Sequence, residues 1–123
     1  MTPEMNADQI AEIRPALREA IDGAPDTCVT FTVAGAPEKW LQVLGSTINT
    51  AYPHEGDPEE WLHSLPRISP QIEVEACQPG LFATFQFPAI EITPTARWID
   101  GWFVQVLGCL PGEYHLDIQC ERM

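Results

Sequence analysis

Four ionisable side chains stand close together near the middle of the chain and could in principle hold a metal ion. They are His54, Glu55, Asp57 and His63. Their spacing matches no closed or catalytic metal site, and the acids are better explained as residues that cap a helix. We therefore expect no metal ion, and we expect no other cofactor.

The other residues that could do chemistry lack the neighbours that they would need. His115 is expected on a solvated strand face between two acids, whereas a general base needs a cleft and a nucleophile. Ser46 and Thr47 follow Gly45, but the lysine of a phosphate-binding loop is missing. No serine stands in a Gly-x-Ser-x-Gly turn. The sequence therefore predicts a protein that is not an enzyme.

The four cysteines are widely spaced, and no two of them form a CxxC pair. They are Cys28, Cys77, Cys109 and Cys120. This spacing fits neither a zinc site nor a redox motif. Although an even number of cysteines permits disulfides, we expect reduced and mostly buried thiols.

The net charge of the chain limits the kinds of molecule that it is expected to bind. The chain has 18 Asp and Glu against 6 Lys and Arg, which gives a formal net charge of −12. Such a field repels phosphate backbones and anionic lipids, so we expect neither nucleic acid nor a membrane surface as a partner. The same charge favours a basic partner, although it is equally explained as an aid to solubility.

Length and composition predict one globular domain spanning residues 1–123, because 45% of the residues are apolar and can form a core. No apolar run approaches the roughly 20 residues that a membrane-spanning helix needs. The first residues also lack the basic and apolar segments of a signal peptide. We therefore expect the protein in the cytoplasm.

Hydrophobic periodicity predicts an α+β fold, a mostly antiparallel sheet with three helices in the order α-β-β-β-α-β-β-α-β. The helices are expected from Asn6 to about Gly23 with Pro15 inside, from Asp57 to no further than Pro66, and over 95–108 with Thr93 as N-cap. The strands are expected at 27–34, 39–45, 46–52, 71–77, 81–88 and 113–121, with a turn at 36–38.

Two strands alternate without interruption. In 71–77, Ile72, Val74 and Ala76 are expected to point inward, with Glu73 and Glu75 outward. In 113–121, Tyr114, Leu116, Ile118 and Cys120 share one face, and the other face carries Glu113, His115, Asp117, Gln119 and Glu121. We expect one sheet face to be covered by helices and parts of the other to be acidic and solvated.

The helix at 95–108 has an unusually wide apolar surface. Its apolar side chains, including Trp98 and Trp102, cover about half of a helical wheel. Only Arg97, Asp100, Gly101, Val104 and Gln105 are left for the other side. The helix is explained as a central core helix, or as one whose Trp98 and Trp102 flank packs on the sheet while the other flank contacts a second chain.

The order of elements resembles the type III secretion chaperone-like superfamily, including the bacterial TY-Chap domains. The segments that carry the resemblance are VTFTV, KWLQVL, QIEVEACQPGLFATFQF and ARWIDGWFVQVLGC. The strand at 113–121 is an addition to the minimal version. The resemblance implies a non-catalytic acidic protein, often a homodimer, that binds an extended segment of a secreted or unfinished partner along hydrophobic grooves beside the sheet.

These features lead to a chaperone-like protein-binding module as the main functional hypothesis. Its expected contacts with an effector or an unfinished chain are Trp61, Leu62, Trp98, Trp102, Glu73, Glu75 and Asp117. The alternative is an acidic inhibitor or immunity protein that blocks the basic active site of a toxin or nuclease, through Glu73, Glu75, Glu113, Asp117 and Glu121. A third hypothesis is a small-ligand carrier with a pocket between the sheet and the last helix.

Overall fold

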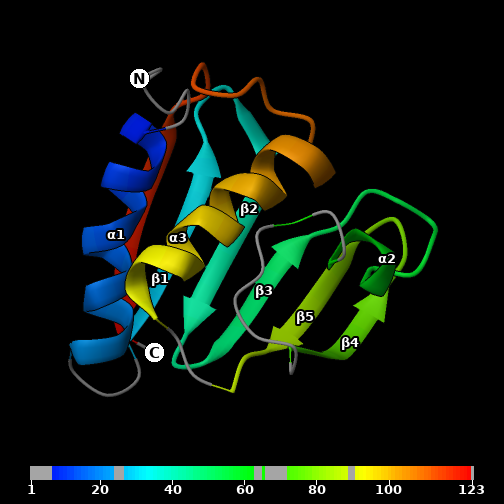
Figure 1. Cartoon of the computed structure of the whole chain (residues 1–123), viewed down its shortest axis with the longest axis horizontal. Helices are drawn as coiled ribbons and strands as arrows, with labels where there is room; N and C mark the ends of the chain where they lie inside the picture. Colours follow the sequence, from blue (N-terminus) through cyan, green and yellow to red (C-terminus); the bar gives the residue numbers. More distant parts are fainter. Residues whose placement is uncertain (1–6, 24–26, 63–64, 66–71, 89–90, 123) are drawn as a thin grey trace.

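A computed structural model of the chain describes residues 7–23, 27–62, 65, 72–88 and 91–122 (Figure 1). It confirms the α+β class and the predicted order of elements. The helices are α1 (Ala7–Asp22), α2 (Glu59–Leu62) and α3 (Ile92–Gly101), which continues into a π-helix, η1 (Trp102–Val106). The strands are β1 (Thr27–Val33), β2 (Ala36–Leu44), β3 (Thr47–Ala51), β4 (Glu73–Gln78), β5 (Phe82–Gln86) and β6 (Leu116–Arg122).

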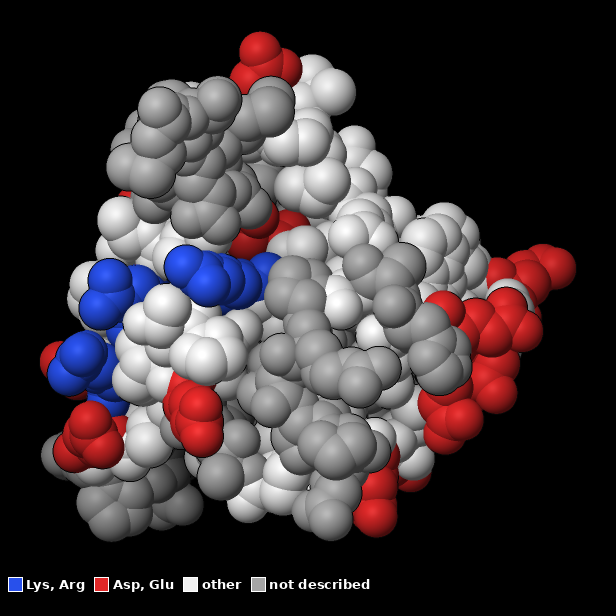
Figure 2. All heavy atoms as spheres, viewed as in Figure 1, with Lys and Arg blue, Asp and Glu red and all other residues white. Residues whose placement is uncertain are grey.

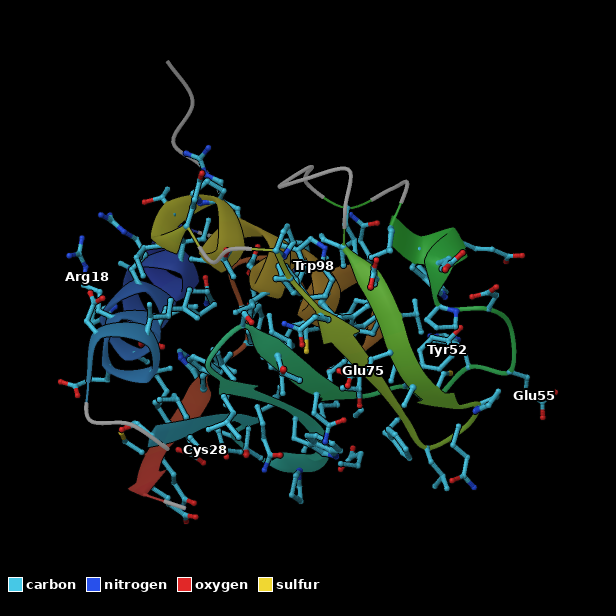
Figure 3. All side chains as sticks on the ribbon, turned by 90° about the horizontal axis from the view of Figure 1, so that it is seen from below. Arg18, Cys28, Tyr52, Glu55, Glu75 and Trp98 are labelled. Carbon is cyan, nitrogen blue, oxygen red and sulfur yellow. The ribbon has the colours of Figure 1, made fainter. Side chains whose placement is uncertain are left out.

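The six strands form one antiparallel sheet in the order β4-β5-β3-β2-β1-β6. Helices α1 and α3 lie side by side across one face of it (Figure 1). Seen from below, α1, α2 and α3 all lie on the same side, and the strands direct side chains away from them on the other (Figure 3). Among the described elements, the sheet therefore has one face covered by helices and one open face.

The core lies between the sheet and the helices. One register row across the sheet joins Val29, Val43, Ile48 and Phe85, and all four side chains are completely buried. From α1, a stripe at helical spacing that includes Ile13 and Leu17 is equally buried. Such large aliphatic side chains each contribute about 1.5–3 kcal/mol when they leave water, so this layer holds α1 and α3 on the sheet.

Several predicted boundaries agree with the structure, but the strand expected at 113–121 starts only at Leu116. The first helix ends at Asp22, next to the predicted Gly23, whose N–H bonds to the carbonyl of Glu19. The chain remains helical through Pro15. The capping role of Asp57 is confirmed, because its Oδ1 accepts the N–H of Glu59 at 2.9 Å. The expected cap Asn6, the boundary Pro66 and the metal candidate His63 lie outside the described residues.

The predicted turn at 36–38 and the predicted N-cap of the third helix are wrong. The first turn is formed by Ala34 and Gly35 rather than 36–38, because only glycine adopts the left-handed φ of +82° at Gly35 without cost. Thr93 is not the N-cap of α3. The helix starts at Ile92, and its N-cap is Glu91, two residues before Thr93. The backbone of Glu91 is extended, and its side chain makes no capping hydrogen bond.

Strand β4 also departs from its predicted alternation. The register with β5 shifts between Val74 and Ala76, so that Glu75 is an extra residue in a β-bulge. After the bulge, Ala76 pairs with Thr84 and is exposed, whereas Cys77 turns toward the core. The prediction that Ala76 points inward is therefore wrong, since one inserted residue exchanges the two faces of a strand.

All four cysteines are free thiols. Cys28 and Cys109 are buried, Cys77 is half-buried and Cys120 is exposed. Burial raises the pKa of the Cys28, Cys77 and Cys109 thiols. No helix in the part of the chain that the structure describes is long and apolar enough to cross a membrane.

Candidate functional site

The histidine with metal-ligand potential is instead part of a structural contact. His54 Nε2 lies 2.7 Å from the carbonyl oxygen of Val106, which joins the loop after β3 to the π-helix. Its ring lies 4.8 Å from that of Trp61 and 5.7 Å from that of Tyr52. No group of three or more potential metal ligands occurs in the described residues. This arrangement connects α2, the loop after β3 and η1.

One carboxylate that was predicted at the surface is buried in the structure. Asp100, expected on the polar side of its helix, is only 1% exposed. The hydroxyl of Tyr114 donates to its Oδ1 at 2.5 Å. Burial and the neighbouring Asp100 carboxylate raise the pKa of Tyr114 far above its usual value. Gln9 donates to the Tyr114 carbonyl at 2.7 Å, so this cluster ties α1 and α3 to the segment before β6.

The tryptophans of α3 and η1 belong to the core. Trp98 and Trp102 are 1% and 0% exposed, and their rings stack at 5.3 Å. The rings of Phe85 and Phe87 lie nearly perpendicular to the Trp98 ring, with centroid distances of 5.5 and 5.2 Å. The tryptophan flank therefore packs on the sheet, as one interpretation of this helix predicts, and neither indole is exposed for the partner contacts expected at Trp98 and Trp102.

The remaining predicted contacts lie on separate parts of the molecule. Trp61 and Leu62 are half-buried on α2. Glu73 and Glu75 are exposed on β4, and Asp117 is exposed on β6. Strands β4 and β6 are the two outer strands of the sheet, so these acids lie at opposite margins.

The open face of the sheet extends between these margins and carries mostly polar side chains. Its central register row consists of Gln119, Thr30, Gln42, Asn49, Thr84 and Ala76. Bonds between side chains hold it: Thr84 donates to Asn49 Oδ1 at 2.9 Å, and Thr47 donates to Gln86 Oε1 at 2.8 Å. Such bonded side chains are fixed before a ligand arrives, which lowers the entropy cost of binding.

Apolar side chains interrupt this polar surface. Trp40 pairs with Thr32 and is half-buried, and Phe82 lies on the same face of β5. Leu44, which pairs with Cys28, is 42% exposed. Aromatic side chains surrounded by polar groups are enriched at the centres of protein interfaces. These three residues were not among the predicted contacts, because their strands do not show which face of the sheet the helices leave open.

Charge on the open face has one sign. The register puts Asp117 and Glu121 of β6 and Glu73 of β4 on this face, two at one margin and one at the other. None of the described strand side chains on this face is a lysine or an arginine. Glu113 lies in the turn before β6 and Glu75 in the bulge of β4, and both are exposed.

Basic side chains gather on the opposite, helix-covered side. Figure 2 shows the Lys and Arg side chains over α1 and α3, where Arg14, Arg18 and Arg97 lie, and acidic side chains along the edge near α2 and β4. The lysine and arginine side chains seen in this view therefore lie on the helix-covered side and not on the open face.

No protein-family model matches this chain, and no curated protein or solved structure is significantly similar to it. The candidate site is therefore defined by its geometry alone. It is the open face of the sheet, with half-exposed aromatic side chains, fixed polar groups and acidic margins.

Proposed function

We propose that this protein is a non-catalytic, cytoplasmic, chaperone-like module that holds a segment of a partner protein against the open face. The observation that carries the proposal is the position of the half-buried Trp40 and Phe82 and the exposed Leu44 on a sheet face that no described element covers. These side chains supply apolar area, and the fixed amides and hydroxyls around them supply hydrogen bonds. The proposal accords with the resemblance to secretion chaperones, while moving the contacts from the helices to the sheet.

The charge of the open face supports a basic partner. Glu73, Asp117 and Glu121 place carboxylates at both margins, and a positively charged segment lying between them would be attracted from either side. With a chain net charge of −12, encounter with such a segment is accelerated at low ionic strength.

The same acids favour a second candidate function, an inhibitor or immunity protein that covers the basic active site of a toxin or nuclease. The two functions differ in what limits binding. An inhibitor depends on charge, so its association rate falls steeply as salt rises from low to physiological concentration. A chaperone that binds mainly through Trp40 and Phe82 keeps its partner in high salt.

The test is a pull-down of the partner with variants of the open face. The double substitution Trp40→Ala and Phe82→Ala is expected to weaken partner recovery at least about tenfold, because aromatic anchors supply much of the affinity of an interface. Leu110→Ala is the matched control, since Leu110 is 64% exposed but lies outside the sheet. Equal losses from both variants, or a loss from Trp61→Ala alone, would place the contact elsewhere.

A further inference from the structure

The two outer strands of the sheet differ in how well they could accept another strand. Strand β4 carries the bulge at Glu75, and a bulge bends an edge and interrupts its ladder. Strand β6 pairs with β1 through seven consecutive residues without a register shift, and it contains no proline. Natural proteins usually protect an outer strand of this regularity. In the described part of the chain, no strand lies beyond β6.

The free backbone groups of β6 can be assigned from one hydrogen bond. The N–H of Ala34 donates to the carbonyl of His115 at 2.9 Å, so this opposed pair bonds directly across the ladder. In an antiparallel ladder, bonded and non-bonded pairs alternate. The N–H and C=O groups of Asp117, Gln119 and Glu121 therefore point toward β1, and those of Ile118 and Cys120 point outward.

The two faces of β6 carry different kinds of side chain, apolar ones on the helix side and polar or acidic ones on the open face. On the helix side, Ile118 is 38% exposed and Cys120 is exposed, although their partners on β1, Phe31 and Val29, are completely buried. The helix layer therefore covers β1 but leaves apolar surface on β6. On the open face, Asp117 and Glu121 are exposed with Gln119 between them.

From this geometry we propose that the partner segment adds to the sheet as a seventh strand along β6, and that it carries the pattern basic–apolar–polar–apolar–basic. This inference rests on the proposed function and names the contacts of one part of the partner. The two basic side chains would face Asp117 and Glu121, and the two apolar ones would cover Ile118 and Cys120. The pattern reads the same in both directions, so it fits a parallel or an antiparallel strand.

A second copy of this chain fits the edge less well. A facing β6 would bring Asp117 and Glu121 beside the same two acids, and like charges on adjacent strands repel. Each copy also carries a net charge of −12. Charge complementarity therefore selects a basic segment of another protein as the occupant.

The binding test uses three labelled synthetic peptides and fluorescence anisotropy. The first has Lys-Val-Thr-Val-Lys at its centre, the second Glu-Val-Thr-Val-Glu, and the third Lys-Lys-Thr-Val-Val, whose side chains no register sorts onto two faces. Only the first is expected to bind saturably. The double substitution Asp117→Lys and Glu121→Lys should weaken the affinity for the first peptide at least about tenfold. The same variant should bind the second peptide.

A backbone test distinguishes strand addition from charge attraction alone. Cys120→Pro removes an outward N–H without breaking a bond to β1, and proline is tolerated at such positions of an outer strand. Cys120→Ala is the matched control that keeps the N–H. We expect the proline variant to lose the first peptide and the alanine variant to keep it. In NMR spectra, the peptide should slow amide exchange at Ile118 and Cys120.

Four results would overturn the inference. They are no saturable binding of the first peptide, equal binding of the third, peptide-induced shifts confined to residues outside β6, and dimerisation of the free protein through β6. If the peptide fails while the Trp40 and Phe82 variant still loses its partner, only the strand addition is wrong. If that variant also keeps its partner, the proposed function is wrong as well.

Discussion

Trp98→Ala is expected to lower the free energy of unfolding by about 3–5 kcal/mol, the usual cost of truncating a buried aromatic side chain. Trp98 is 1% exposed, and its ring contacts those of Phe85, Phe87 and Trp102. Its removal leaves a cavity between α3 and the sheet that these rigid rings cannot fill. Urea denaturation followed by circular dichroism measures the change.

Trp40→Ala is the matched control for this experiment. It removes the same side chain from a half-exposed position on the open face, so we expect a much smaller loss of stability and a larger loss of partner binding. Equal denaturation midpoints for Trp98→Ala and the unmodified protein would contradict the placement of α3 in the core.

The second large effect is expected from Tyr114→Phe. The hydroxyl of Tyr114 donates to the buried carboxylate of Asp100, and its removal deprives a charged group of a donor. Such a loss costs about 1–3 kcal/mol. Phenylalanine keeps the ring that lies 5.6 Å from Phe103, so the change isolates the hydrogen bond. Unchanged stability of this variant at neutral pH would contradict the assignment.

The same residue predicts a dependence on alkaline pH. Burial and Asp100 raise the pKa of Tyr114 in the folded state, whereas in the unfolded chain it titrates near pH 10. The unfolded state thus loses its proton first, and stability that is complete below about pH 10 falls as pH rises further. Burial raises the pKa of Tyr52 as well, so Tyr114→Phe should reduce the alkaline slope without abolishing it. An unchanged slope would show that Tyr114 ionises normally.

The order of elements could be predicted from the sequence because each element is specified by local periodicity. The alternation of Val29, Phe31 and Val33 and the helical spacing of Ile10, Ile13 and Leu17 both describe faces that are buried in the structure. The open face was likewise expected as partly acidic and solvated. Its polar row of threonine, glutamine and asparagine follows from the same alternation.

The features that could not be predicted depend on contacts between distant segments. From its helix alone, Asp100 is predicted at the surface, and only the contact with Tyr114 explains its burial. The bulge at Glu75 is defined by the pairing of β4 with β5, which the sequence of β4 does not show. The π-helix is closed by a bond from the Leu107 N–H to the Trp102 carbonyl at 3.1 Å, which no local pattern indicates. Trp40 was not predicted as a partner contact, because the sequence of its strand does not show which face of the sheet the helices leave open.

The most direct test of the central claim is site-specific photo-cross-linking in the native host. Benzoylphenylalanine replaces Trp40 on the open face in one variant and Arg18 on the exposed side of α1 in a control. We predict that position 40 cross-links to a partner protein and that position 18 does not. Cross-linking from position 18 with none from position 40 would contradict binding through the open face.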